Sequence, residues 1–226
     1  MWMERRILDP IANCPERFMT YGFLDIAITP SVRAVQEDMG VASRWQDFTG
    51  QRTFDSFTGD EAAFIAERDS FYMATVSETG WPYVQHRGGP AGFLKVIDAR
   101  TLAFADYRGN RQYISTGNLA ADNRACLFLM DYPRRARLKI YVRIETLGVD
   151  DDPALTARVT ESGHGAKIER IFRVHLENFD WNCPQHITRR FNEAEIETAI
   201  APLRAQLARL EQENRALQMR LAEAGG

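Results

Sequence analysis

The sequence predicts a mainly β fold with flanking helices, arranged as an antiparallel meander or a small barrel. Between residues 71 and 149, short runs rich in β-branched and aromatic residues alternate with tight turns. The strand–helix–strand spacing of a doubly wound sheet is missing, and so are the glycine-rich nucleotide-binding motifs that accompany it. In addition, 45% of the 226 residues are hydrophobic, which is enough to bury a core.

The first 57 residues predict a helical N-terminal extension that covers one side of the sheet domain. Thr29 can cap a helix, Pro30 suits its first position, and Gly40 can end it. A second helix begins at Thr58, because Glu61 three residues later completes a capping box. The main domain is therefore predicted to begin at residue 58.

The main domain, residues 58–190, contains the predicted strands and two further helices. A helical stretch covers residues 111–121, and Asp152 with Pro153 can open another helix. The predicted strands lie at residues 71–78, 81–89, 91–98, 101–107, 125–132, 137–149 and 169–181.

The last segment, residues 191–226, predicts an amphipathic helix of the coiled-coil type. Its apolar residues alternate in steps of four and three, which is the a/d pattern of a heptad repeat. One interpretation is a helix packed on its own domain; the other is a parallel two-stranded coil, in which Asn214 at an a position fixes the register. Pro202 is expected to kink or restart the helix. The seam consists of Ile196, Ile200, Leu203, Leu207, Leu210, Asn214, Leu217 and Leu221.

Charge and composition exclude several classes of protein. The net charge of −3 gives no electrostatic argument for binding nucleic acid or an anionic membrane. The longest apolar run, residues 125–130, is too short to cross a bilayer, and Asp9 and Pro10 interrupt any signal-peptide pattern. We therefore expect a soluble, cytoplasmic protein without a nucleic-acid or membrane partner.

Cysteine usage predicts neither disulfides nor a metal site. Cys14, Cys126 and Cys183 are odd in number and widely spaced. Cys183 and His186 have the spacing of half a metal site, but no second pair stands nearby. We therefore predict no bound metal.

Polar residues gather at the ends of the predicted strands between Trp81 and Asn118. A glycine turn follows the third of these strands and opens a helix, and a helix N-terminus flanked by arginines is a natural phosphate site. The alternative is that Arg108 and Arg111 are solvated loop arginines. The candidate residues are Gln85, His86 and Arg87 on one strand, Lys95 on the next, Asp106 and Tyr107 on the third, and Arg108, Asn110, Arg111 and Gln112 in the turn.

The order of these motifs resembles the pyridoxamine 5′-phosphate oxidase superfamily. The resemblance covers residues 57–149, with matching elements to about residue 190. It is carried by a Gly-Trp-Pro-Tyr-Val strand, the Gln85–Arg87 triplet, the turn after Tyr107 and the Asn118-Leu119 pair. It implies a six-stranded antiparallel split β-barrel that forms a homodimer and binds two FMN molecules at the dimer interface.

The resemblance also implies roles for individual residues. Arg87 and Lys95 would lie near the FMN phosphate and ring, and residues 110–112 would form the phosphate turn, with Gln112 in place of the family's lysine. Gln85, Lys95 and Gln185 are candidates for the pyrimidine edge of the ring. Trp181 would stack on the ring, or would instead be a core tryptophan that closes the barrel.

The function implied is that of an FMN-dependent oxidoreductase acting on a small-molecule substrate. No residue is an obvious acid, base or nucleophile, which is normal when the cofactor carries the reaction. The alternatives are a non-catalytic flavin- or haem-binding module and a deazaflavin-dependent reductase.

Overall fold

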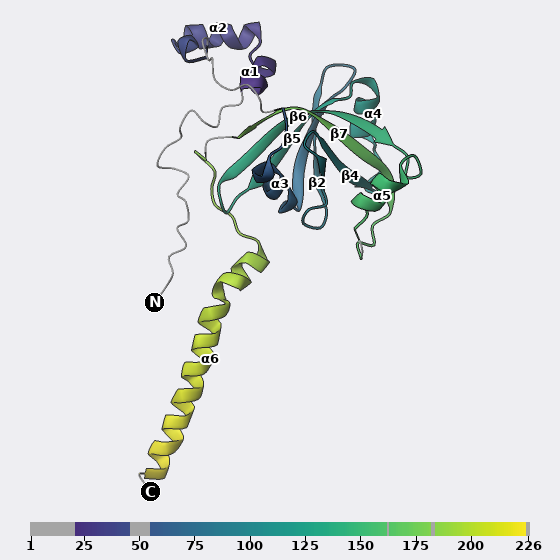
Figure 1. Ribbon diagram of the computed structural model, residues 1–226. Coiled ribbons are helices and arrows are strands. Elements are labelled where there is room, and N and C mark those ends of the chain that lie inside the picture. Colours follow the sequence, from purple (N-terminus) through teal and green to yellow (C-terminus); the bar gives the residue numbers. More distant parts are fainter. Residues whose placement is uncertain (1–20, 46–54, 162, 182–183, 225–226) are drawn as a thin grey trace. The chain divides into compact units, whose positions relative to one another are not determined.

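The chain forms two compact units, residues 1–131 with 135–187, and residues 132–134 with 188–226. They are described here from a computed structural model, which describes residues 21–45, 55–161, 163–181 and 184–224 (Figure 1). The larger unit contains the sheet, and the smaller contains one long helix.

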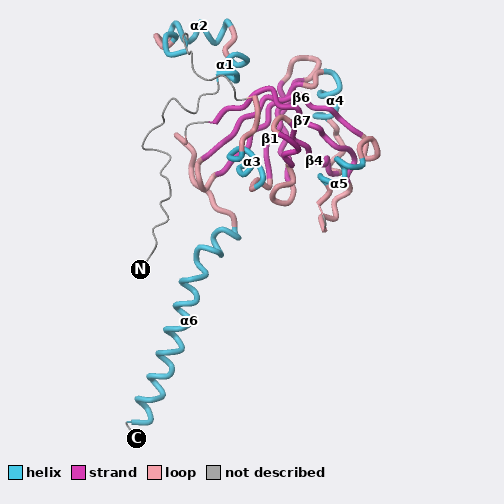
Figure 2. Tube along the Cα trace, in the orientation of Figure 1, coloured by secondary structure: helices cyan, strands magenta, loops and turns pink. Residues whose placement is uncertain are grey.

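One antiparallel sheet dominates the larger unit, with the strand order β2-β1-β5-β6-β7-β4-β3 (Figure 2). The sheet is not closed, because β2 and β3 at its two edges do not pair, so the predicted split-barrel class is confirmed. The described residues form seven strands, one in each of the seven ranges predicted along the chain, so the count of six that the family resemblance implies is wrong. The short β3 pairs with β4 alone. The strands are β1 (Ser70–Val76), β2 (Pro82–Gly88), β3 (Lys95–Asp98), β4 (Thr101–Tyr107), β5 (Arg124–Asp131), β6 (Ala136–Leu147) and β7 (Ile168–Trp181).

Short helices accompany the sheet. The predicted start at Asp152 and Pro153 is confirmed, since the Asp152 side chain accepts a hydrogen bond from the Leu155 N–H. The helices of the larger unit are α1 (Tyr21–Ala27), α2 (Pro30–Asp38), the 3₁₀ turn η2 (Ala42–Trp45), α3 (Gly59–Ala66), α4 (Ile114–Ala121) and α5 (Pro153–Val159).

The main core is rich in phenylalanine. Phe104 packs edge-on against Phe71 and at a tilt against Phe172, with ring centroids 5.2 Å apart in both pairs. A second, smaller core lies beneath α5, where Ala103 and Ala105 let the helix approach β4 closely. Strand β4 is consequently buried on both faces, which holds its C-terminal end firmly in place.

Helix α3 is fixed to the end of β7. The predicted capping box is present, and the Glu61 carboxylate accepts a hydrogen bond from the Thr58 N–H at 2.9 Å. The same carboxylate accepts a hydrogen bond from the Trp181 indole N–H at 2.7 Å, and the indole packs edge-on against Phe64. Burial alone would raise the pKa of Glu61, but the hydrogen bonds from Thr58 and Trp181 lower it below its ordinary value.

The two described N-terminal helices differ in their packing. In α1, Phe23 stacks on Tyr141 of β6 with centroids 4.3 Å apart and is 4% exposed. In α2, Thr29 caps the helix as predicted, but no side chain is buried. Most of the predicted extension, residues 1–20 and 46–54, lies outside the described residues.

The smaller unit contains α6 (Glu193–Ala224), a single helix of 32 residues. The helix continues through Pro202. It does not restart at this proline, which was one of the two outcomes predicted. None of its described side chains is buried. Among the described residues, no helix is long and apolar enough to span a membrane.

Candidate functional site

A small polar pocket lies where β2, β4 and the start of α4 meet. Its volume is about 40 Å³, which is room for a small polar group and not for a ring system. The lining combines side chains from the two strands with the turn that links β4 to α4. It consists of Gln85, Arg87, Asp106, Tyr107, Gly109, Asn110, Arg111, Tyr113, Ser115, Thr116 and Glu169.

The turn between β4 and α4 has an unusual backbone. Arg111 and Tyr113 both have left-handed φ values, 63° and 54°, which non-glycine residues adopt at a cost. The Asn110 side chain holds the turn, since it accepts a hydrogen bond from the Gln112 N–H at 3.1 Å and donates one to the Gln112 side chain. Helix α4 therefore begins at Ile114 and not at residue 111 as predicted.

The N-terminus of α4 opens on the pocket. Its N-cap, Tyr113, supplies no side-chain hydrogen bond, so the first N–H groups of the helix have no side-chain cap. Ser115 donates a hydrogen bond to the Gln85 side chain at 2.8 Å, which fixes Gln85 at the rim. Thr116 accepts one from Arg170 at 2.8 Å. Uncapped helical N–H groups are suited to an anion.

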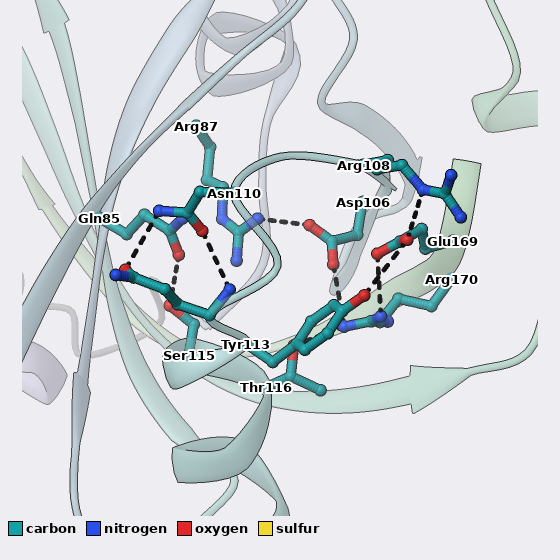
Figure 3. A network of polar contacts seen from close by, with 11 residues as sticks. Gln85, Arg87, Asp106, Arg108, Asn110, Tyr113, Ser115, Thr116, Glu169 and Arg170 are labelled. Carbon is teal, nitrogen blue, oxygen red and sulfur yellow. Dashed lines mark hydrogen bonds and ion pairs between the residues drawn. The ribbon is translucent and has the colours of Figure 1, made fainter. Parts of the chain in front are cut away.

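Asp106 joins two arginines at the pocket (Figure 3). One of its carboxylate oxygens pairs with Arg87 and the other with Arg170, the latter at 3.3 Å. Only 7% of the Asp106 side chain and 13% of the Arg87 side chain are exposed. The Nε of Arg87 is buried and has no hydrogen-bond partner within the described part of the chain. The site therefore holds an arginine with an unused donor.

Glu169 forms the second ionic centre. Its carboxylate accepts hydrogen bonds from Arg108 Nε at 2.9 Å and from the Tyr113 hydroxyl at 3.3 Å, and it lies 3.3 Å from Arg170 (Figure 3). The register of β4 and β7 shifts here, because Asp106 lies opposite Arg170 while Tyr107 lies opposite Ile168. Glu169 is the extra residue of this bulge, which explains how neighbouring residues both reach the site.

The two carboxyl groups have opposite pKa shifts. Burial raises the pKa of Asp106, and the charges of Arg87 and Arg170 offset this only in part. The hydrogen bond from Arg108 is the main cause that lowers the pKa of Glu169. Glu169 is thus ionised at neutral pH and fixes the orientation of Arg108.

Six of the twelve predicted residues line the pocket: Gln85, Arg87, Asp106, Tyr107, Asn110 and Arg111. Arg108 lies beside them, held by its ion pair with Glu169. Gln112 belongs to the same turn and bonds to Asn110.

The other four predicted residues lie elsewhere. His86 packs edge-on against Tyr72 on the opposite face of β2, and Lys95 forms an ion pair with Glu161. Trp181 donates its indole N–H to Glu61 beside α3 and packs, partly buried, against the main core. Gln185 is exposed in a turn.

The structure also adds residues that the sequence analysis did not single out. Tyr113, Ser115 and Thr116 follow directly on the predicted turn, so extending the turn into α4 would have found them. Glu169 and Arg170 carry no local signal, because only the pairing of β7 with β4 brings them to the pocket.

No cluster of three or more potential metal ligands occurs among the residues that the structure describes. Of the half metal site considered above, Cys183 lies outside the described residues.

An open antiparallel barrel with an arginine-lined pocket at a helix N-terminus defines a split barrel with a candidate anion site. A family model described as pyridoxamine 5′-phosphate oxidase matches residues 57–180. The chain belongs to this family, as the resemblance of its motifs predicted.

Solved structures similar to this chain include three with related descriptions. A protein of the pyridoxinephosphate oxidase family from Clostridium acetobutylicum, related to general stress protein 26 of B. subtilis, is 16% identical; the match covers 61% of this chain and 94% of that one, with a TM-score of 0.41. An FMN-binding protein from Syntrophomonas wolfei is 12% identical, with coverage of 68% and 97% and a TM-score of 0.43. An F420 reductase is 20% identical, with coverage of 51% and 93% and a TM-score of 0.36. No curated protein matches the chain.

Proposed function

We propose that this protein binds FMN and is an FMN-dependent oxidoreductase that acts on a small-molecule substrate. The observation that supports this most directly is the arginine-rich pocket at the uncapped N-terminus of α4. FMN ends in a phosphate group, and a pocket of this size and polarity suits such a group.

The charges of the site fit a phosphate dianion. Arg87, Arg108 and Arg170 form ion pairs with two carboxylates, those of Asp106 and Glu169, and Arg111 also lines the pocket. These six residues together carry two net positive charges. A phosphate monoester carries a charge of about −1.5 to −2 at neutral pH. Its binding would bring the site close to neutrality, and the unused Nε of Arg87 offers a charged donor.

The residues of this chain would bind and orient the cofactor. The turn and Arg87 would hold the phosphate, and Asp106 and Glu169 would keep the arginines in place before the cofactor arrives. Gln85, fixed by Ser115, could donate a hydrogen bond from its amide to the ligand. The flavin, when bound, would supply the hydride and electron transfer chemistry.

A titration of the purified protein with FMN and with riboflavin tests this proposal. We expect FMN to bind with the absorption bands of a flavin, and riboflavin, which lacks the phosphate, to bind at least about 100-fold more weakly, because several charged hydrogen bonds are lost. Arg111→Ala should weaken FMN about 10–150-fold, whereas Arg209→Ala in α6 should leave it unchanged. Equal affinity for FMN and riboflavin would contradict the phosphate site; a Soret band or a deazaflavin spectrum in the protein as purified would favour the alternative cofactors.

We further propose that the barrel forms a homodimer, with its interface on the outer face of β1 and β2, opposite the face of β2 that presents Gln85 and Arg87. The outward faces of β1 and β2 expose Tyr72, Val76 and Val84, and the register places Val84 opposite Ala74 on that face. Trp81, in the turn between these strands, is 76% exposed. A second copy related by a twofold axis would bury these side chains in an isologous interface.

The change Val84→Glu should weaken this dimer, because it places a charge among apolar side chains at the interface. Sedimentation velocity should show a larger monomer fraction than for the wild type, and an FMN titration of the same variant tests whether the second copy takes part in the flavin site. Glu78→Gln, in the adjoining turn, is a matched surface change that should affect neither. A monomeric variant that retains full FMN affinity would show that the flavin site belongs to one chain.

A further inference from the structure

Helix α6 has a stable start but no partner among the described residues. Asn192 and Glu195 form a reciprocal capping box at its beginning, with both hydrogen bonds at 2.8 Å. Yet no side chain of the helix is buried, and Leu203, Leu207, Leu210, Leu217 and Leu221 are between 48% and 73% exposed. A helix in water gains most of its stability from packing an apolar face, so this row of leucines requires a partner surface.

The spacing of the apolar residues along α6 indicates what kind of surface the partner has. The exposed residues Ile196, Leu203, Leu210 and Leu217 occupy d positions, and Ile200, Leu207, Asn214 and Leu221 occupy a positions. This stripe covers two residues in seven, which is narrower than the face of a helix packed on a domain. It fits another helix with the same stripe.

We propose that α6 pairs with α6 of a second copy of this chain, as a parallel, in-register, two-stranded coiled coil. Asn214 is the residue that determines which partner binds and in which orientation. Only an identical helix that runs parallel and in register places Asn214 opposite the partner's Asn214, so that the two amides can bond to each other. The flanking positions are compatible: Gln206 faces the partner's Glu211, Glu213 faces the partner's Gln218, and no like charges oppose each other.

The antiparallel arrangement is less favourable. Full overlap would set Asn214 against the partner's Leu203 and leave its amide buried without a partner. It would gain an ion pair between Arg204 and the partner's Glu211, but an exposed ion pair contributes little by comparison. In addition, Arg204 already pairs with Glu197 of its own helix. The cost of leaving the Asn214 amide unpaired therefore exceeds the gain from the ion pair, and the parallel coil is the more stable arrangement.

Disulfide cross-linking of the full-length chain tests this proposal, which does not rest on flavin binding. In Leu217→Cys, the new cysteine at a d position would face the partner's copy of itself in a parallel coil. In an antiparallel coil it would face the partner's Ile200, 17 residues along the helix, and the two cysteines would be about 25 Å apart. The matched control is Gln212→Cys, on the opposite side of the helix and with the same natural cysteines. Both side chains are exposed in the single chain, so neither change disturbs the fold of the chain itself.

Under mild oxidation, we expect Leu217→Cys to form covalent dimers about tenfold faster than Gln212→Cys, because a disulfide requires Cα atoms within about 7 Å. Equal rates for the two variants would overturn the proposal. So would a cross-link that appears only in the double variant Ile200→Cys/Leu217→Cys, since that would show an antiparallel pair. As a second measurement, Asn214→Leu should raise the melting temperature of the assembly and allow higher oligomers in sedimentation equilibrium. An unchanged assembly size and melting temperature would show that Asn214 is not buried in a coil.

Discussion

Replacing Arg87 with methionine should lower the affinity for FMN by at least about 100-fold, the largest effect expected of any single change in the pocket. The change removes the buried cation whose Nε has no other partner among the described residues. It also leaves the Asp106 carboxylate facing the phosphate with less counter-charge. Loss of a donor and gain of repulsion act in the same direction, so the effect should exceed that of Arg111→Ala.

The same change should destabilise the folded protein by about 3 kcal/mol, because it breaks a buried ion pair and leaves one partner behind. Arg170, at 3.3 Å from Asp106, limits the loss. The loss of stability caused by Arg87→Met should become smaller as the pH falls, because protonation removes the charge of the Asp106 carboxylate that the change leaves with less counter-charge. A carboxyl group whose pKa is raised in the folded state favours folding while it is protonated, and this contribution is lost as the pH rises above its ordinary value of 3.8.

The double variant Arg87→Met/Asp106→Asn separates binding from stability. Removing the carboxylate's charge along with the arginine should restore much of the stability, because no buried charge is left unpaired. The affinity for FMN should remain low, because the donor is still missing. Fluorescence quenching measures the affinity, and urea unfolding between pH 4 and pH 8 measures the stability. A folded Arg87→Met protein with wild-type FMN affinity would contradict the role proposed for Arg87.

The sequence predicted those parts of the site that depend on neighbours along the chain. Strand periodicity located Arg87 and Asp106, and the glycine turn located Arg108 and Asn110. The late start of α4 was not predictable in this way, because nothing local shows that Arg111 and Tyr113 adopt left-handed backbone conformations.

Contacts between distant residues account for the remaining differences. Glu169 enters the site because a bulge in β7 lies opposite the end of β4, and Trp181 lies beside α3 because its indole bonds to Glu61, 120 residues away. Lys95 similarly forms an ion pair with Glu161, which is distant from it in the sequence. Such pairings depend on strand register, which a single sequence does not determine at bulges.

The change Phe172→Ala should destabilise the protein by about 3–5 kcal/mol, which is the range for removing a fully buried aromatic ring. Phe172 is 0% exposed, its ring packs against Phe104, and the Arg87 guanidinium lies over it at 5.6 Å. The cavity would therefore open next to the Arg87 guanidinium and loosen Arg87 as well as the core. The matched control is Phe191→Ala, since Phe191 is 57% exposed and its loss should cost less than about 0.5 kcal/mol.

Urea unfolding of both variants measures this difference, and FMN titration in the absence of urea shows whether the core and the site are coupled. Because Phe172 supports Arg87 from below, we expect the folded fraction of Phe172→Ala to bind FMN about tenfold more weakly, a change of about 1.4 kcal/mol. Phe172→Leu fills most of the cavity and should recover much of the stability. If Phe172→Leu recovers stability but not affinity, the aromatic face beneath Arg87 positions the guanidinium. Full affinity in Phe172→Ala would instead show that Asp106 and the strand ends hold Arg87 without help from the core.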